Sequence, residues 1–420
     1  MNRQVLVLAI IVVLICGPAK ATAGDAESTH CAQITAWVMG GVSSQRAMQI
    51  ISENPITFSP SVKDVSGLPA LQPERATLNP ASGCTKAIES GAQLLRSKRY
   101  EDAERVLHRL LTGDSRDAAI HFALGALRQM QGDWDGAFDE FSESKRLLPG
   151  LPETHNRLAW NFYHSDDGEN AIAEARTTLS IDPRNAEAYR FLGLGFYSNG
   201  MLEAALHAFA QSLLLEPENR DTFLGIGLTL QAQNHKYRAM GAFRHALKLD
   251  PEFWEAHYQV AAIFQARGRF ERAIEEYGYA KRLAPAETKI REALADLYFQ
   301  KGDFSAASHE FGELLSLNSK SETAHFGLAK VLIARRSYLA AVDELRQAIQ
   351  LDPDVSDGHR VLGEILLLTH QREEGIEELR RAVELDPESA LAQRTLAAAL
   401  RPAHAHDLLS KQLHEAIDNR

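Results

Sequence analysis

The sequence predicts an all-α protein built as a stack of repeated helical hairpins, and three observations predict it. Prolines recur at a step of 34 residues, two columns at the same step hold only glycine or alanine, and the intervening apolar residues follow the spacing of amphipathic helices. At 420 residues the chain is also too long for one compact core, so a repeat array or several domains are expected.

The first observation is the proline column. Successive members lie 34 residues apart, or twice that where Ser319 takes the place of a proline: Pro149, Pro183, Pro217, Pro251, Pro285, Pro353 and Pro387. Proline cannot continue a helix, and it disfavours helical geometry in the residue before it. Each proline therefore predicts the end of one hairpin and the start of the next.

The second observation is the pair of small-residue columns. Twelve residues before the prolines and Ser319 lie Ala137, Ala171, Ala205, Ala239, Ala273, Ala307, Ala341 and Gly375, and Ala103 extends the column upstream. A further twelve residues upstream lie Gly91, Gly125, Ala159, Gly193, Gly227, Ala261, Ala295, Ala329 and Gly363. Two helices pack closely only where a small side chain admits the neighbour's ridge. The columns therefore mark the contact between the first (A) and second (B) helix of each hairpin.

The third observation is the apolar pattern around these contacts. One large column reads Leu124, Leu158, Leu192, Ile226, Val260, Leu294, Leu328 and Leu362, and another reads Phe141, Phe209, Phe243, Tyr277, Phe311, Leu345 and Leu379. Spacings of three, four and seven within each half give the period of an amphipathic helix. Between the halves fall Gly132, Gly200, Asn234, Gly268 and Gly302, where we expect a left-handed residue to end helix A.

This pattern resembles that of tetratricopeptide-repeat (TPR) proteins, whose 34-residue unit runs aromatic, Leu-Gly, Tyr, Ala, Phe, Ala, Pro. The resemblance covers residues 84–389 as nine gapless repeats beginning at 84, 118, 152, 186, 220, 254, 288, 322 and 356. Residues 390–420 are then expected to form a capping helix pair. The resemblance implies an α-solenoid that winds as a right-handed superhelix, with the A helices lining its concave side.

The N-terminal residues 1–23 are typical of a secretory signal peptide: Arg3, an apolar run from Val5 to Cys16, and an A-x-A site ending at Ala23. A lipoprotein anchored through Cys16 and a retained membrane anchor are the alternatives. Cleavage would remove two positive charges and move the formal charge from −11 to −13. An acidic chain is a poor candidate for binding nucleic acid. We expect an exported protein, periplasmic or secreted, with no stable membrane span after cleavage.

Residues 24–53 are interpreted as a short helical module and residues 54–83, with five prolines, as a linker. The phrase around Trp37 and Gly40-Gly41-Val42-Ser43-Ser44 resembles a module ahead of repeat or enzymatic domains in exported bacterial proteins, notably acidobacterial ones. An even pair of cysteines in an exported chain favours a Cys31–Cys84 disulfide, with two free thiols as the alternative.

Catalytic and metal sites are not predicted. The sequence contains no nucleophile elbow, Walker loop or H-E-x-x-H motif. His404 and His406 form an H-x-H pair with no third ligand nearby. Packing roles are expected for a histidine column at the fourth repeat position: His121, His155, His257, His325 and His359. We therefore expect no enzymatic activity and no cofactor.

Partner binding is predicted at the second, fifth, ninth and twelfth repeat positions, which the resemblance places in the concave groove. The informative residues there are Phe122, Asn156, Trp160, Tyr163, Arg190, Tyr197, Tyr258, Gln265, Glu292, Phe299, Phe326, Lys330 and Arg360. Aromatic and arginine side chains are the usual anchors of a protein interface, although some of these rings could instead pack between A helices. No fifth position holds lysine, so the family's carboxylate clamp is not matched.

The resulting functional expectation is a scaffold that binds a peptide or protein partner in the periplasm or cell envelope. An accessory subunit of envelope or polysaccharide assembly or export machinery is the alternative. A hydrolase with an unrecognised site is a third.

Overall fold

The computed structural model describes residues 37, 41–42, 46–47, 49–50, 100–110 and 118–401. Across these residues the chain forms helices and no strand, so the predicted all-α class is confirmed. Contacts divide the chain into two compact units, with unit 1 ending at His235 and unit 2 beginning at Lys236. The predicted signal peptide (1–23), linker (54–83), Cys31–Cys84 disulfide and His404–His406 pair lie outside the described residues.

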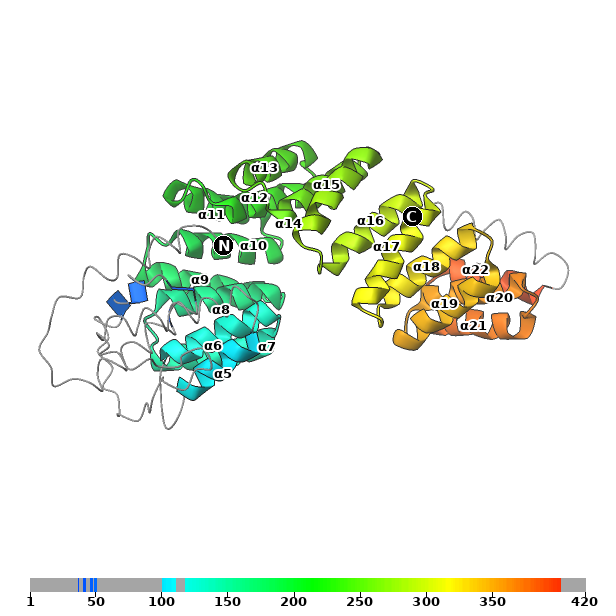
Figure 1. The fold of residues 1–420 in the computed structure, drawn as a ribbon, viewed down its shortest axis with the longest axis horizontal. Coiled ribbons are helices and arrows are strands. Elements are labelled where there is room, and N and C mark those ends of the chain that lie inside the picture. The colour runs from blue at the N-terminus through cyan, green and yellow to red at the C-terminus, as the bar shows by residue number, and fades with distance from the viewer. Residues whose placement is uncertain are drawn as a thin grey trace, which may run out of the picture. The chain divides into compact units, whose positions relative to one another are not determined.

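From Tyr100 on, the described part of unit 1 contains three complete hairpins and two further helices, drawn in cyan and green in Figure 1. Its helices are α5 (Tyr100–Leu110), α6 (Ala118–Gln131), α7 (Trp134–Leu147), α8 (Pro152–His164), α9 (Gly168–Ile181), α10 (Ala186–Ser198), α11 (Leu202–Leu215) and α12 (Arg220–Ala232). In the three complete hairpins the A helix packs against the B helix that follows it: α6 against α7, α8 against α9, and α10 against α11. Neighbouring hairpins also contact one another, so the apolar faces are buried along the stack.

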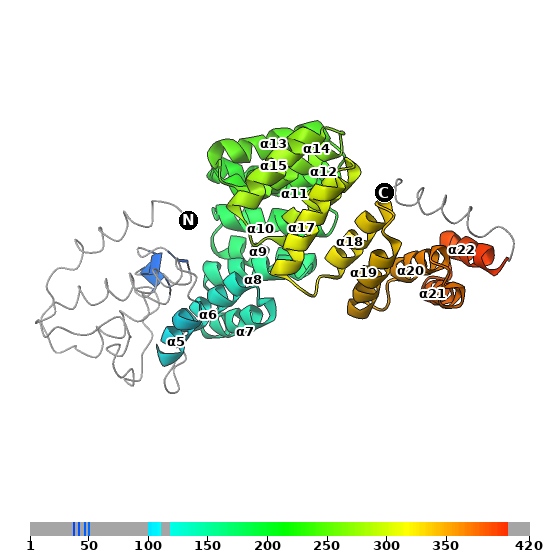
Figure 2. The same ribbon diagram turned by 45° about the vertical axis from the view of Figure 1, so that its right-hand side comes forward.

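Unit 2 continues in the same way, as Figure 2 shows from green to red. Its helices are α13 (Lys236–Leu249), α14 (Trp254–Gln265), α15 (Phe270–Leu283), α16 (Thr288–Gln300), α17 (Phe304–Leu317), α18 (Glu322–Ala334), α19 (Tyr338–Leu351), α20 (Ser356–Leu368), α21 (Arg372–Leu385) and α22 (Ala390–Leu400). None of the described helices is long and apolar enough to cross a bilayer.

Helix starts follow the 34-residue step. The A helices from α6 to α20 begin at residues 118, 152, 186, 220, 254, 288, 322 and 356, the positions from which the repeats were counted. Side chains that precede several helices cap them: Asp133, Asn185 and Ser321 each accept a hydrogen bond from a backbone N–H three residues on. The last described helix, α22, begins at the next step, residue 390.

Turns between A and B helices use one left-handed residue at the fifteenth repeat position. The predicted residues Gly132, Gly200, Asn234, Gly268 and Gly302 all have positive φ, which confirms that expectation. Three residues without a glycine signature adopt the same conformation: Asp166 (φ 56°), Arg336 (φ 59°) and His370 (φ 65°).

The small-residue columns lie where the sequence placed them. All members of the alanine column in the described residues are buried, and a Cβ built on Gly125 would lie 2.8 Å from Cε1 of Phe141. Gly193 stands in the same relation to Phe209 at 2.6 Å, and Gly363 to Leu379 at 2.7 Å. The glycine of helix A therefore accommodates the large residue of helix B, and that large residue is fully buried.

Candidate partner-binding face

The predicted binding residues all lie on A helices, and we call the thirteen residues listed for partner binding above the A-helix face. Most of them are partly exposed: Trp160, Tyr163, Arg190, Tyr197, Tyr258, Gln265, Glu292, Phe299, Phe326 and Lys330. Phe122, Asn156 and Arg360 are buried, each at 5% exposure or less. A partner could contact these three residues only if the side chains that cover them were displaced.

In unit 1 the face carries a cluster of rings on α8 and α10. The rings of Trp160 and Tyr163 stack with their centroids 5.6 Å apart, and Phe191 lies 5.7 Å from Trp160. The guanidinium of Arg190 covers Phe191 at 4.2 Å and approaches Trp160 at 5.8 Å. The rings thus pack between neighbouring A helices, as the alternative interpretation held, while Trp160, Tyr163 and Arg190 keep part of their surface exposed.

Tyr163 is a neutral hydrogen-bonding group on this face. Burial raises the pKa of its phenol, and the nearby Tyr197 and Asp166 raise it further. Since an ordinary tyrosine already titrates near pH 10, Tyr163 keeps its proton throughout the physiological range. The cluster therefore offers flat apolar area, the guanidinium of Arg190 and the neutral hydroxyl of Tyr163, a chemistry that suits protein recognition.

Asn156 has a structural role in this arrangement. Its Nδ2 donates to Oδ1 of Asn185 at 3.2 Å and to Oε2 of Glu187 at 3.1 Å, which joins α8 to the start of α10. Glu187 also pairs with Arg190 at 3.3 Å. The buried amide therefore helps to position the arginine that borders the ring cluster.

Unit 2 presents a second cluster, on α14 and α16. The Nζ of Lys289 lies 4.6 Å from the ring centroid of Trp254 and 5.9 Å from that of Tyr258. Burial raises the pKa of Tyr258, with Glu292 adding to the shift. Here too, half-exposed rings lie beside a cation.

Carboxylates and a further lysine extend this unit 2 surface along α16 and α18. Burial raises the pKa of Glu292, and Asp296 raises it further. Burial also raises the pKa of Asp296, although Lys330 opposes that shift from 3.9 Å. Lys330 in turn lies 5.3 Å from the ring of Phe299. The unit 2 surface is therefore mixed in charge, whereas the ring cluster of unit 1 is bordered by an arginine.

Arg360 is committed to contacts inside unit 2. It pairs with Glu364 at 2.8 Å and with Asp357 at 3.1 Å, and Thr395 of α22 donates to Glu364 at 3.3 Å. Burial raises the pKa of Glu364, and Arg360 opposes that shift. A buried and paired arginine of this kind contributes to local structure rather than to an open surface.

The histidine column forms hydrogen bonds that sequence reasoning missed. Each of these histidines on an A helix contacts, through Nδ1, a glutamate nineteen residues later on the B helix of its own hairpin, at 2.5–2.8 Å. The pairs are His121–Glu140, His155–Glu174, His257–Glu276, His325–Glu344 and His359–Glu378. In the hairpin that has arginine instead, Arg291 meets Glu310 at 3.3 Å.

The signal for these pairs was present in the repeats. Wherever the fourth position holds histidine or arginine in the complete hairpins, the twenty-third position holds glutamate. Where the fourth position is Tyr189 or Phe223, the twenty-third is Ala208 or Ala242. Reading the two columns together would have predicted a polar contact between the helices of a hairpin.

A metal centre is not formed by these side chains. Among the described residues no group of three or more histidine, cysteine, aspartate or glutamate side chains is placed to hold a metal ion.

Three stretches of the chain, residues 91–152, 224–288 and 292–356, match the family model described as tetratricopeptide repeat. This chain carries tetratricopeptide repeats. Combined with the hairpin stack, the match confirms the predicted fold class, a TPR α-solenoid.

Among solved structures, the TPR chain is similar to one from the APC/C hetero-tetramer Cut9–Hcn1, with 15% identity and a TM-score of 0.53. That match covers 71% of this chain and 59% of the other, so the chain spans less than two thirds of that relative. Two shorter proteins are also similar, TTC0263 of Thermus thermophilus (21% identity, TM-score 0.41, 43% of this chain and 99% of that one) and pilF of Pseudomonas aeruginosa (21%, 0.39, 50% and 94%). No curated protein matches the chain.

Proposed function

We propose that this chain is a non-enzymatic scaffold of the periplasm or cell envelope that binds a peptide or protein partner through its A-helix face. The repeat fold supports the scaffold role, since TPR proteins are protein-interaction modules. The signal-peptide pattern of residues 1–23 supports export.

The observation that carries the proposal is the ring cluster on α8 and α10. Trp160, Tyr163 and Tyr197 are half-buried, so each keeps area that a partner can cover. Their neighbours already fix their orientation, through the Trp160–Tyr163 stack and the packing of Tyr197 into the same apolar cluster. A partner therefore meets an ordered surface, and little side-chain entropy is lost on binding.

Affinity purification from the native envelope, with the tagged full-length chain, tests this proposal. Trp160→Ala combined with Tyr197→Ala should weaken capture of the specific partner by at least about tenfold, the effect typical of losing an interface hot spot. The matched control is Leu214→Ala on the B helix α11, whose side chain is 74% exposed. It should keep the partner.

A folded double variant that captures every partner as well as the native chain would exclude the ring cluster as the binding surface. Circular dichroism at the same protein concentration verifies folding of both variants. The accessory-subunit alternative stays a prediction from the sequence.

A further inference from the structure

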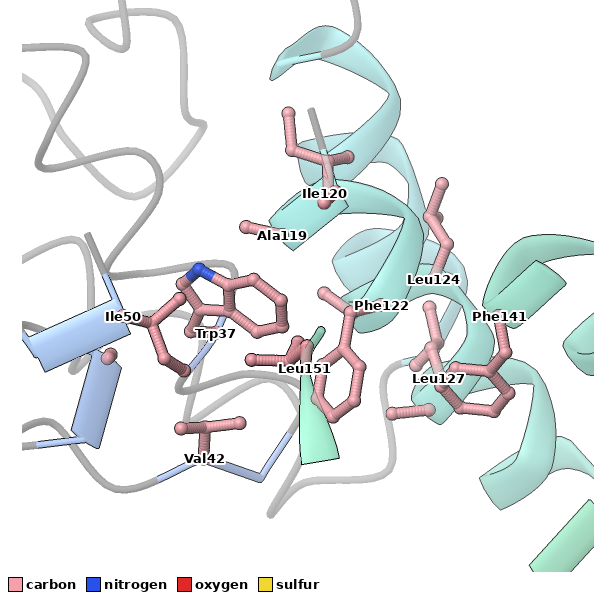
Figure 3. Packing of buried hydrophobic residues seen from close by; sticks show 14 of the residues in the cluster. Trp37, Val42, Ile50, Ala119, Ile120, Phe122, Leu124, Leu127, Phe141 and Leu151 are labelled. Carbon is pink, nitrogen blue, oxygen red and sulfur yellow. The ribbon is translucent and has the colours of Figure 1, made fainter. Parts of the chain in front are cut away.

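Trp37, from the N-terminal module, lies on the A-helix face at the start of unit 1. Its side chain is 2% exposed, and its ring centroid lies 4.9 Å from that of Phe122 on α6. Figure 3 shows the indole between Ile50 on one side and Phe122 and Leu151 on the other. Phe122 is itself 1% exposed, although its repeat position is one at which the sequence predicted partner contact.

The backbone around Trp37 is built to place it there. Trp37 is helical, and the N–H of Val42 donates to its carbonyl at 2.9 Å, closing the end of the helix. Gly41, between them, has a φ of 95°, as expected for a glycine that ends a helix in this way. A Cβ on Gly41 would also lie 2.7 Å from Nη2 of Arg157 on α8, so glycine fits the contact as well as the turn.

The following helical residues add a second line of contact. Ala47 and Ile50 are buried at 0% and 2% exposure, whereas Gln49 between them is exposed. Arg46 pairs through Nε with Oε1 of Glu153 on α8 at 2.6 Å. Glu153 stands at the second position of its repeat, another position predicted to face a partner. The contact is therefore amphipathic, with a tryptophan anchor, the three buried apolar residues Val42, Ala47 and Ile50, and one ion pair.

We infer that the N-terminal segment, through Trp37, Val42, Arg46, Ala47 and Ile50, is an intrachain peptide ligand of the A-helix face at α6 and α8. The segment meets the repeats by an aromatic anchor, buried apolar residues and an ion pair, the kinds of contact by which receptors hold peptide ligands. A tether holds it at an effective concentration in the millimolar range. This end of the face is thus closed to a partner of the same chemistry unless that partner displaces the segment.

This inference rests on the proposed function only in using the A-helix face, and its test requires no unidentified partner. A fluorescently labelled synthetic peptide of residues 31–53 is titrated into the full-length chain, and binding is measured by anisotropy. Because the native chain already holds its own segment, it should bind the peptide poorly. The full-length Trp37→Ala chain should bind the same peptide about tenfold more tightly or better, since its own segment no longer competes at millimolar effective concentration.

Variants of the peptide define the contact. On the Trp37→Ala chain, a peptide carrying Trp37→Ala or Arg46→Glu should lose about tenfold or more in affinity, because each removes an anchor. A chain carrying Trp37→Ala and Glu153→Arg should recover binding of the Arg46→Glu peptide, which a purely structural disturbance would not do.

Equal binding of the peptide by the native and Trp37→Ala chains, or undiminished binding of the Trp37→Ala peptide, would overturn the inference. If the Trp37→Ala chain loses helicity, the Arg46→Glu chain replaces it. That substitution leaves the apolar contacts in place, and the chain that carries it should also bind the peptide more tightly than the native chain does. If neither variant chain binds the peptide more tightly than the native chain does, the inference is overturned. The proposed partner surface at Trp160 would be unaffected by that result.

Discussion

One left-handed residue forms the turn in each complete hairpin, and its identity varies from glycine to arginine. The sequence predicted the glycines and Asn234, because these residues adopt positive φ most readily. Asp166, Arg336 and His370 could not be predicted from their side chains. Their conformation follows from the register, because the helices on either side leave one residue to make the turn.

Replacing Arg336 by glycine should stabilise the chain. Arg336 has a φ of 59°, a conformation that costs a non-glycine residue roughly 1–2 kcal/mol. Glycine loses about 0.5–1 kcal/mol more in backbone entropy on folding, so the net gain should lie between about 0 and 1.5 kcal/mol. Urea unfolding followed by circular dichroism measures it.

Gly268→Ala is the reciprocal control. A Cβ at Gly268 would meet no atom within 4 Å, so any loss there comes from its φ of 67° alone. That variant should be destabilised by about 1 kcal/mol. An Arg336→Gly chain with a lower urea midpoint than the native chain would contradict the assignment of strain to this turn.

The His257–Glu276 pair makes the stability of its hairpin depend on pH. Burial lowers the pKa of His257, but hydrogen bonds to Glu276 and to the carbonyl of Pro251, at 2.6 and 3.0 Å, outweigh burial and raise the pKa above its usual value. Arg282 opposes the shift, and Tyr279 stacks on the ring at 5.4 Å. The folded state therefore favours the protonated ring.

Because the folded pKa of His257 lies above the unfolded one, the pair's contribution to stability is complete below the unfolded pKa, about 6.5. That contribution is lost as pH rises through the folded pKa. The repeat that begins at residue 220 has Phe223 and Ala242 where the next repeat has His257 and Glu276, so phenylalanine and alanine are natural uncharged replacements at these two positions. A His257→Phe, Glu276→Ala chain should therefore lose less melting temperature than the native chain between pH 6 and pH 9.

Thermal melts of the two chains at matched ionic strength make the comparison. Identical pH dependence in both would show that the pair does not carry the effect. His257→Gln alone is a useful third chain, since it removes the titrating group and keeps Glu276 in place.

The hairpins themselves depend on the small-residue contact between A and B helices. Ala273 of α15 is 0% exposed, and it occupies the alanine column that the sequence singled out. The column could be predicted because close packing admits few residue types, so it repeats visibly even where the surface varies. Helix α17 ends at Leu317 although Ser319 stands where other repeats have proline, and the backbone N–H of Asn318 donates to the carbonyl of Leu314. The proline is therefore not needed to end this helix.

Ala273→Leu should overpack this junction in unit 2 and cost about 1–3 kcal/mol. Chemical unfolding monitored by circular dichroism gives the difference in free energy. Ala340→Leu on α19 is the matched control, because Ala340 is exposed and in a helix of the same kind. An unchanged unfolding curve for Ala273→Leu would contradict the repeat register.

Across the chain, the repeat pattern predicted far more of the fold than of the surface. The 34-residue step runs through His235 and Lys236 without a break, so nothing in it predicts that unit 1 ends between them. Nor could it show that Phe122 is covered, because Trp37 belongs to a segment outside the repeats and distant in sequence. Contacts that recur in every hairpin leave a periodic trace in the sequence, and single contacts leave none.

The alternation between histidine–glutamate and aromatic–alanine pairs has a consequence for how this chain responds to alkali. In two consecutive repeats, residues 186–219 and 220–253, the fourth and twenty-third positions are Tyr189 and Ala208, and Phe223 and Ala242. These two have no imidazole proton to release at that contact, whereas the next hairpin holds His257 against Glu276. Rising pH therefore weakens the His257–Glu276 contact of the hairpin that begins at residue 254, whereas the two preceding repeats have no imidazole at the fourth position, so this loss of stability is local.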